Sequence, residues 1–148
     1  MTGPDRYRPC YENHPALAVG GGRVIYGGSC LTPFVTDADL YVGFDTGMGP
    51  SGAAQRILFE IIDMTPPQDA ESFRALVANV SARLDRGEKV HVGCIGGHGR
   101  TGTFLAALVA YRRVSDDPIA YVRQHYCERA VETSEQAAFL ARHFGCNA

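Results

Sequence analysis

Residues 89–102 read Lys-Val-His-Val-Gly-Cys-Ile-Gly-Gly-His-Gly-Arg-Thr-Gly, and this stretch decides the fold. Its first part, Lys89–Gly93, predicts a short strand. The glycine-rich segment Cys94–Gly99 follows, and the Ala- and Leu-rich residues Thr101–Arg113 predict a helix. A strand, a glycine-rich loop and a helix in this order form a site for an anion. The backbone N–H groups of such a loop turn inward, and the helix N-terminus adds partial positive charge.

Three further strands are expected before this stretch. They cover Arg23–Tyr26, which we expect to stop at Gly27-Gly28, then Leu40–Phe44, and then Arg56–Ile62, which runs into a loop with two prolines. A helix with Asp69 as its N-cap and Gly87 as its stop separates the last of these strands from Lys89–Gly93.

Two shorter helices are expected to close the chain, one beginning at Ser115–Pro118 and one at Thr133–Gln136 that stops at Gly145. Strands that alternate with helices are typical of an α/β domain. We therefore expect an α/β fold with a central, mostly parallel sheet of four to five strands flanked by helices. Residues 1–148 are expected to form a single domain, in which residues 1–22 are irregular because Pro and Gly interrupt them.

The composition limits the class of protein and its partners. The chain has 148 residues, of which 45% are hydrophobic and 20% charged, so it can bury a core. A formal net charge of -2 disfavours a nucleic-acid partner, which requires a basic surface. The N-terminus lacks the pattern of a signal peptide, and no apolar run reaches the ~20 residues of a membrane span. We expect a cytoplasmic protein with no membrane contact.

The cysteines are odd in number and scattered. The five lie without any CxxC spacing, which fits neither a disulfide framework nor a cysteine-based zinc site. The sequence therefore predicts free thiols in a reducing compartment and no bound metal.

The loop residues are suited both to hold phosphate and to attack it. Gly96, Gly97 and Gly99 let the backbone N–H groups of residues 95–100, including those of Ile95 and His98, close round a small anion. Arg100 can offer a bidentate fork to two phosphate oxygens. Cys94 begins the loop, where the same field stabilises a thiolate, so we predict a nucleophile aimed at phosphorus.

The loop has two other interpretations. A nucleotide-binding Walker loop requires a glycine in the place of Cys94 and a lysine in the place of Arg100, and neither is present. The other is structural: Cys94 would only be a small buried hydrophobe at the end of a strand.

With its spacing, the run Cys94–Thr101 resembles the C-x5-R-[ST] signature of the Cys-based protein tyrosine phosphatases. Over about residues 24–144 the chain is similar to their compact dual-specificity branch. Residues 63–67, Asp-Met-Thr-Pro-Pro, look like the D-x-x-P-P general-acid loop of the lipid-phosphatase and regenerating-liver relatives. Residues 129–136 are similar to the downstream segment whose Gln helps to position a water. One departure is Gly93, which stands where the family usually has His.

The resemblance implies a phosphate monoester hydrolase that needs no metal or other cofactor. In its first step Cys94 attacks the monoester and forms a phosphocysteine, while Asp63 protonates the leaving oxygen. Asp63 then acts as base for the water that hydrolyses the intermediate. Arg100 holds the phosphate oxygens, Thr101 hydrogen-bonds the Cys94 sulfur, and Gln136 is the candidate for positioning the water.

Alternatives stay open for several of these roles. Asp63 can simply begin a turn, and Asp69 and Asp45 are then the other candidate acids. Gln136 stands at the capping-box spacing from Thr133, which explains it without catalysis.

The expected ligand is a phosphorylated protein or peptide, with phosphate or a similar oxyanion in the loop. Ile95 and His98 stand where lipid-phosphatase relatives carry basic residues, which disfavours a phosphoinositide. The negative net charge disfavours a 5′-phosphorylated RNA. A module that binds phosphate without turnover is the alternative from another functional class.

Overall fold

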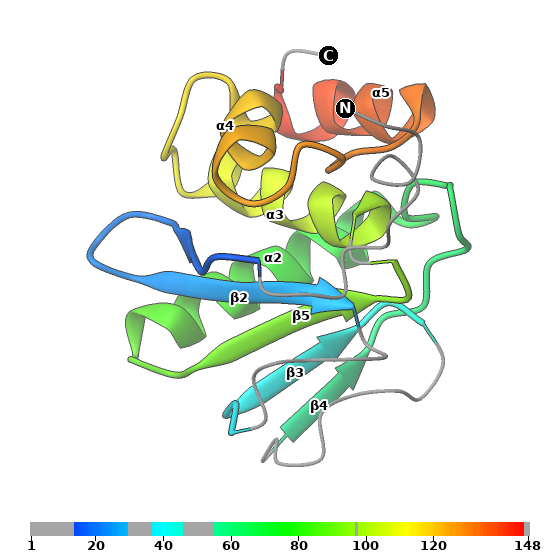
Figure 1. The fold of residues 1–148 in the computed structure, drawn as a ribbon. Coiled ribbons are helices and arrows are strands. Elements are labelled where there is room, and N and C mark those ends of the chain that lie inside the picture. The colour runs from blue at the N-terminus through cyan, green and yellow to red at the C-terminus, as the bar shows by residue number, and fades with distance from the viewer. Residues whose placement is uncertain (1–13, 30–36, 46–54, 97, 147–148) are drawn as a thin grey trace, which may run out of the picture.

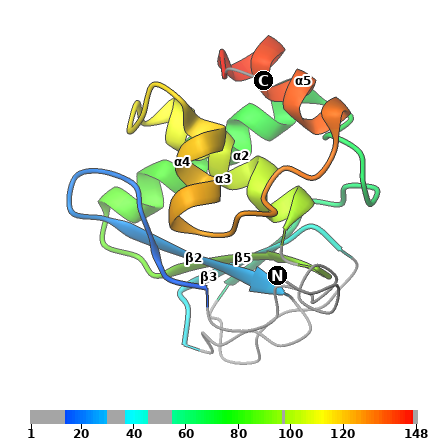
Figure 2. The ribbon, with the colours of Figure 1, turned by 45° about the horizontal axis from the view of Figure 1, so that its top comes forward.

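The computed structural model describes residues 14–29, 37–45, 55–96 and 98–146. These residues form a sheet with helices laid over one of its faces (Figure 1). Turning the molecule separates the two layers, with the described helices on one side and the strands on the other (Figure 2). The chain thus has the α/β architecture that the alternation of strands and helices predicts.

Five strands form the sheet, in the order β1-β2-β5-β3-β4. Their bounds are β1 (Leu17–Ala18), β2 (Val24–Ser29), β3 (Leu40–Gly43), β4 (Gln55–Leu58) and β5 (Val90–Cys94). β2, β5, β3 and β4 are parallel neighbours, and β1 adds an antiparallel pair at the edge beside β2. The predicted mostly parallel sheet of four to five strands is confirmed.

The helical layer is built round one apolar helix. The described helices are α2 (Ala70–Asp85), α3 (Gly99–Tyr111), α4 (Pro118–His125) and α5 (Ser134–Phe144). α3 packs against each of the other three and against β5, and 11 of its 13 residues are buried. The Ala- and Leu-rich composition that predicts this helix therefore also places it in the core.

The predicted helix starts are confirmed by their caps. Asp69 accepts a hydrogen bond from the Glu71 N–H over 3.0 Å at the start of α2. Asp117 caps α4, and Thr133 with Gln136 forms the capping box of α5. At its end, α5 stops at Gly145, whose φ of 70° is in the left-handed region that glycine favours.

Three predicted boundaries are wrong, and in two of them tertiary pairing outweighs the local pattern. β2 runs through Gly27 and Gly28 to Ser29, since this whole stretch pairs with β5. A Cβ on Gly27 would lie 3.0 Å from the Tyr126 ring, so glycine serves a close approach there rather than a turn.

The strand predicted over residues 56–62 leaves the ladder at Leu58, although Phe59 and Ile61 still donate backbone hydrogen bonds to Gly43 and Phe44. Leu17–Ala18 lies in the segment predicted to be irregular, and it forms β1 by pairing with Ile25 and Val24.

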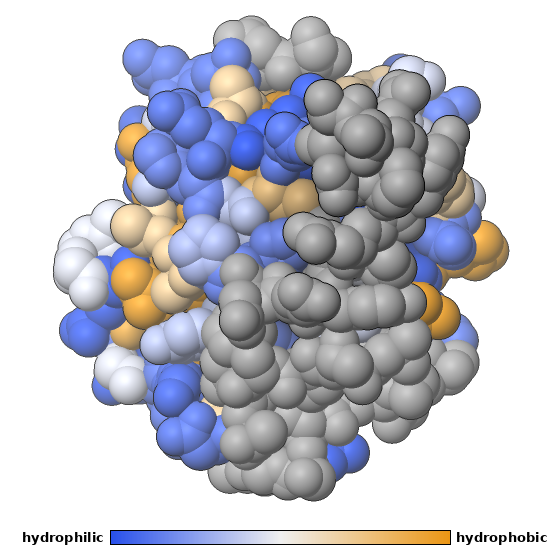
Figure 3. All heavy atoms as spheres, viewed as in Figure 1, coloured by the Kyte–Doolittle hydropathy of each residue, from blue (hydrophilic) through white to orange (hydrophobic). Residues whose placement is uncertain are grey.

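The surface seen in Figure 3 is mixed in its described part, with small apolar areas among hydrophilic side chains. In the ranges that the structure describes, no helix is both long enough and apolar enough to cross a membrane.

The parallel register brings the carboxyl ends of four strands to one edge of the sheet. Ser29 on β2 pairs with Cys94 on β5, and Gly43 on β3 pairs with both Gly93 and Leu58. Ligands of parallel α/β sheets bind outside the carboxyl ends of the strands. The predicted anion loop begins at the carboxyl end of β5, which is the central strand of the sheet.

Candidate active site

Cys94 is the last residue of β5, and its side chain is 2% exposed. Thr101, in the first turn of α3, donates from Oγ1 to Cys94 Sγ over 3.0 Å. The sequence predicts this contact, and the structure contains it. Gly97, in the loop between strand and helix, lies outside the described residues.

Ile95, the first residue of the loop after Cys94, is held at both of its backbone polar groups. The Ile95 N–H donates to Asp45 Oδ2 over 2.7 Å. The Ile95 carbonyl accepts from Ser29 Oγ over 2.6 Å. Since Asp45 follows β3 and Ser29 ends β2, the two strands beside β5 fix the residue that comes directly after Cys94.

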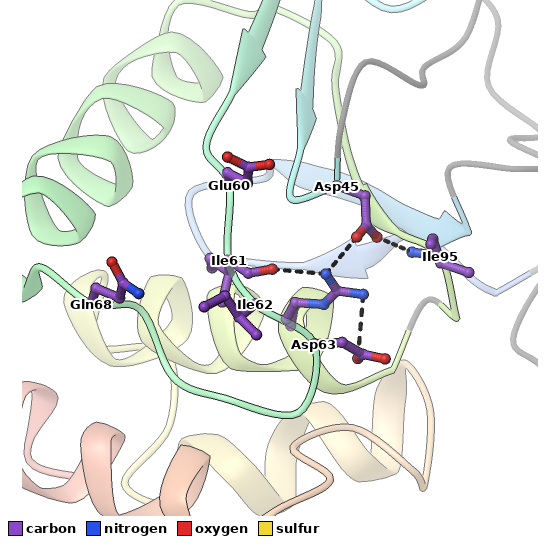
Figure 4. Close-up of a pocket in the computed structure, with 8 residues that line it drawn as sticks. Asp45, Glu60, Ile61, Ile62, Asp63, Gln68 and Ile95 are labelled. Atoms are coloured by element: carbon purple, nitrogen blue, oxygen red, sulfur yellow. Dashed lines mark hydrogen bonds and ion pairs between the residues drawn. The ribbon is translucent and has the colours of Figure 1, made fainter.

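Arg100 lies in the first turn of α3, and its side chain is 3% exposed. Its Nη1 donates to Asp45 Oδ1 over 2.6 Å and to the Ile61 carbonyl over 2.8 Å. Its Nη2 lies 3.3 Å from Asp63 Oδ1. Figure 4 shows Asp45 and Asp63 reaching this guanidinium from different sides. Arg100 Nε is buried and has no hydrogen-bond partner among the described residues.

The charge of Arg100 is secured by its neighbours. Burial of the guanidinium lowers its pKa, but the hydrogen bond to Asp45 and the charges of Cys94, Asp45 and Asp63 outweigh burial, so the pKa lies above its ordinary value. Arg100 is therefore a permanent cation at the carboxyl edge of the sheet.

Asp63 comes from the segment after β4, and its side chain is 72% exposed. The next residue, Met64, has a φ of 67°, which is uncommon for a residue with a side chain. This turn brings the Asp63 carboxylate to Arg100, so the structure places the predicted acid and the predicted phosphate-binding arginine together.

A cavity of about 370 Å³ opens beside these groups (Figure 4). Its walls come from the segments after β3, β4 and β5 and from α3, and its lining residues are Asp45, Glu60, Ile61, Ile62, Asp63, Gln68, Ile95 and Arg100. Among the described residues, three carboxylates and one guanidinium line this cavity, and two of the carboxylates, those of Asp45 and Asp63, reach the guanidinium. Ile62 and Ile95 add exposed apolar surface at the same place.

Gln136 is fully buried in the first turn of α5. Its Oε1 accepts from the N–H groups of Glu132 and Thr133, as a capping box requires. Its Nε2 has no partner among the described residues. A Cβ on Gly99 would lie 3.1 Å from this Nε2, so the free donor faces the last glycine of the loop.

Glu132 also lies against the loop, and sequence reasoning gave it no role of its own. Its Oε1 is so near Gly99 that a Cβ there would overlap it. The segment before it is held by Arg123, which donates to the Ala130 and Val131 carbonyls over 2.8 Å each. Val131 has a φ of 62°, which is strained for a β-branched residue. In the sequence, only the position of Glu132 directly before the capping box of α5 could have indicated a role at the loop.

The two alternative acids differ in position. Asp69 caps α2 and accepts from Ser72 Oγ over 2.8 Å, a bond that holds the pKa of Asp69 below its ordinary value. A carboxyl group that stays ionised is a poor proton donor. Asp45, in contrast, lies at the site, bound to Arg100 and to the Ile95 N–H.

The other residues of the predicted loop have distinct surroundings. His98 is 8% exposed, and its Nδ1 lies 3.9 Å from Cys127 Sγ. Gly93 pairs with Gly28 and Gly43, so glycines occupy this level of three adjacent strands.

The cysteines in the described part are free thiols, as expected for Cys94, Cys127 and Cys146, while Cys10 and Cys30 lie outside it. Burial, together with the charge of Asp117, raises the pKa of the Cys146 thiol to about 11. In the ranges with described coordinates, no group of three or more His, Cys, Asp and Glu side chains could hold a metal.

Comparisons with known proteins identify relatives of this arrangement. The family model PTP-SAK, described as "Swiss Army Knife protein, DSP-PTPase phosphatase domain", matches residues 47–147. Two curated proteins of Methanocaldococcus jannaschii, MJECL20 and MJ0215, both described as uncharacterized, are 47% and 44% identical over 70 residues. These 70 residues are 47% of this chain and 47% and 43% of the two relatives, so the chain spans about half the length of the curated relatives it matches.

Solved structures share the fold. Tk-PTP in a mutant form superimposes with a TM-score of 0.63 at 28% identity, over 74% of this chain and 78% of that one. Tk-PTP in the active form superimposes with a TM-score of 0.69 at 24% identity, over 88% of this chain and 96% of that one. A mouse putative dual specificity phosphatase complexed with zinc tungstate superimposes with a TM-score of 0.71 at 18% identity, over 90% of this chain and 89% of that one.

Proposed function

Because this chain belongs to the DSP-PTPase phosphatase domains, a compact branch of the Cys-based protein tyrosine phosphatases, we propose that it hydrolyses phosphate monoesters through a phosphocysteine at Cys94. One observation carries the proposal. A buried cysteine that accepts a hydrogen bond from Thr101 lies one loop away from a buried arginine whose Nε has no partner in the described residues.

Arg100 is the phosphate-binding group. Its Nη1 is occupied by Asp45 and the Ile61 carbonyl. Its Nε and Nη2 remain on one edge of the guanidinium, and this edge matches two oxygens of a phosphate in a bidentate pair. The ion pair with the exposed Asp63, at 3.3 Å, is the contact that an incoming phosphate displaces most easily.

In the first step, the Cys94 thiolate attacks phosphorus and an S–P bond forms. The bond from phosphorus to the ester oxygen breaks, and that oxygen takes the proton of Asp63. The position of Asp63 at the cavity, beside Arg100, supports this role.

In the second step, water attacks the phosphocysteine and gives its proton to Asp63, while the S–P bond breaks and the thiolate leaves. The hydrogen bond from Thr101 stabilises that thiolate. The unpartnered Gln136 Nε2, which faces Gly99, supports a role for Gln136 in positioning the water.

We propose a phosphorylated protein or peptide as the substrate. Among the described residues, the cavity is lined by the carboxylates of Asp45, Glu60 and Asp63 and by one guanidinium, that of Arg100. This charge balance repels a ligand with several phosphates, such as a phosphoinositide, and a nucleic-acid backbone. The exposed Ile62 and Ile95 offer apolar contact to a phosphorylated side chain.

Steady-state hydrolysis of an aryl phosphate tests the proposal with two matched pairs of variants. Cys94→Ser should abolish turnover, whereas Cys146→Ser should keep it, because Cys146 is a protonated thiol bonded to nothing at the site. Asp63→Asn should lower kcat by about 10²–10⁴-fold, the usual worth of a general acid. Asp69→Asn should keep kcat, since Asn also caps a helix.

The results also separate an enzyme from a binding module. If the wild type binds a phosphopeptide without hydrolysing it, or if Cys94→Ser still turns over, the proposed function is wrong. If Asp63→Asn keeps full activity while Cys94→Ser loses it, the assignment of the acid is wrong and the nucleophile stands.

A further inference from the structure

Asp45 is the most heavily engaged carboxylate at the site, and neither step of the proposed reaction uses it. It lies two residues after the end of β3, and its side chain is 16% exposed. One oxygen accepts from Arg100 Nη1 over 2.6 Å, and the other accepts from the Ile95 N–H over 2.7 Å. A single carboxylate therefore joins the two parts of the phosphate site, the arginine and the first peptide of the loop.

The hydrogen bonds of Arg100 show which edge of the guanidinium is fixed. Nη1 has two hydrogens, and Asp45 and the Ile61 carbonyl accept both of them. These two bonds set the plane of the group. Nε, buried and with no partner in the described part of the chain, is then held on the side away from Asp45, together with Nη2.

The Ile95 peptide is fixed in the same way. Asp45 accepts from the Ile95 N–H, and the Ser29 hydroxyl donates to the Ile95 carbonyl over 2.6 Å. Because Ile95 comes directly after Cys94, these bonds set the direction in which the loop leaves the nucleophile. Groups held by such bonds need no reorganisation when an oxyanion arrives.

We propose that Asp45 is a positioning residue, which orients Arg100 for an oxyanion, fixes the start of the loop by accepting from the Ile95 N–H, and stays in place when the oxyanion binds. In this role the Ile95 N–H does not bind the oxyanion, contrary to the expectation from the sequence. This inference rests on the proposed function for the nature of the ligand. The opposite role, a carboxylate that occupies the donors an oxyanion needs and must leave, fits the geometry less well. While Asp45 holds Nη1, the Nε–Nη2 edge has only the 3.3 Å ion pair with the exposed Asp63 among the described residues, so an oxyanion can take this edge without displacing Asp45.

The two roles predict opposite signs for the affinity of an oxyanion. In calorimetric titrations with tungstate, Asp45→Asn should bind about 10- to 100-fold more weakly than the wild type, since charge-assisted hydrogen bonds to Arg100 and the loop are lost. Unchanged or tighter binding would overturn the inference. Asp85→Asn is the matched control, because Asp85 pairs with Arg112 at the other end of α3, and it should bind tungstate as the wild type does.

A second variant covers the case in which Asp45→Asn does not fold. Asp45→Glu keeps the charge, but its longer side chain cannot reach both donors in the same geometry, so weaker tungstate binding is again expected. Unchanged or tighter binding would again overturn the inference.

The readout also separates this inference from the proposed function. If wild type binds tungstate, Asp45→Asn binds it more weakly and no aryl phosphate is hydrolysed, the positioning role stands and the proposed function fails. If wild type hydrolyses the aryl phosphate and Asp45→Asn binds tungstate unchanged or tighter, the proposed function stands and the positioning role fails.

Discussion

Each end of α3 carries an arginine, with a side chain 3% exposed at Arg100 and 9% exposed at Arg112, and the two use their hydrogen-bond donors differently. Arg112, at the C-terminal end, is satisfied at every nitrogen. Its Nε donates to the Val19 carbonyl, Nη1 to the backbone and side chain of Ser81, and Nη2 to the Gly20 carbonyl and to Asp85. Arg100, at the N-terminal end, has two partners on Nη1, an exposed ion-pair partner near Nη2, and none in the described residues on Nε.

Under the proposed function, this difference separates an arginine that supports the fold from one that binds a ligand. A buried donor without a partner costs about 1–3 kcal/mol, so it is retained where a ligand provides the partner. Arg112 joins the segment before β2 to α2 and α3, and it leaves nothing for a ligand. Arg100 leaves an edge free at the place where four strands end.

The largest expected effect is on catalysis at the Arg100 end. Arg100→Lys should lower kcat/KM for an aryl phosphate by on the order of 10³-fold, because a lysine cannot offer two coplanar donors to the phosphate. The folded state should persist, which thermal unfolding followed by circular dichroism would check. Near wild-type kcat/KM in Arg100→Lys would contradict the proposal that Arg100 binds the phosphate.

The Arg112 end should respond in stability. Arg112→Lys should lower the free energy of unfolding by about 2–4 kcal/mol, since Ser81, Asp85 and the two carbonyls lose most of their partners. The value of kcat/KM per folded molecule should stay within about twofold of the wild type. Urea denaturation and aryl-phosphate kinetics on the same preparation measure the two quantities. A loss of kcat/KM with unchanged stability would reverse the assignment of the two arginines.

A smaller effect should come from His91, in the middle of β5, which ties stability to pH. His91 is fully buried and stacks on Tyr41, and burial lowers its pKa from 6.5 to about 4. The unfolded chain takes up this proton near pH 6.5 and the folded chain only near pH 4, so stability falls as the pH falls between these values. Between pH 7 and pH 5 the expected loss is about 2 kcal/mol.

Urea denaturation at several pH values measures this dependence, with His91→Phe as the control. That variant cannot take up the proton, so its stability should depend less on pH over this interval. An equal dependence in wild type and His91→Phe would exclude His91 as the source.

The sequence predicted the structure best where the structure depends on residues that are close together along the chain. A strand, a glycine-rich loop and a helix follow one another along residues 89–113, so local preferences define all three. Asp69, Asp117 and Thr133 cap their helices for the same reason.

Contacts that cross the sheet were harder to predict. Asp45 reaches Ile95 and Arg100 only because Gly43 pairs with Gly93, a register that no local pattern states. In sequence, the glycines in β2 resemble a stop, because the Tyr126 ring that requires a glycine at Gly27 lies far along the chain. Two roles were predicted for Gln136, a helix cap and the positioning of a water. In the structure its Oε1 belongs to the capping box, and its Nε2, which has no partner among the described residues, faces Gly99.

The central claim is that phosphate is transferred to Cys94 on its way to water. Rapid mixing of the wild type with an aryl phosphate, an acid quench and mass analysis of the peptide that contains Cys94 test it most directly. We predict a phosphoryl group on Cys94 that appears together with the first equivalent of released phenol and is absent from Cys94→Ser. Steady turnover with no phosphoryl group on Cys94 at any time, or turnover by Cys94→Ser, would contradict the account.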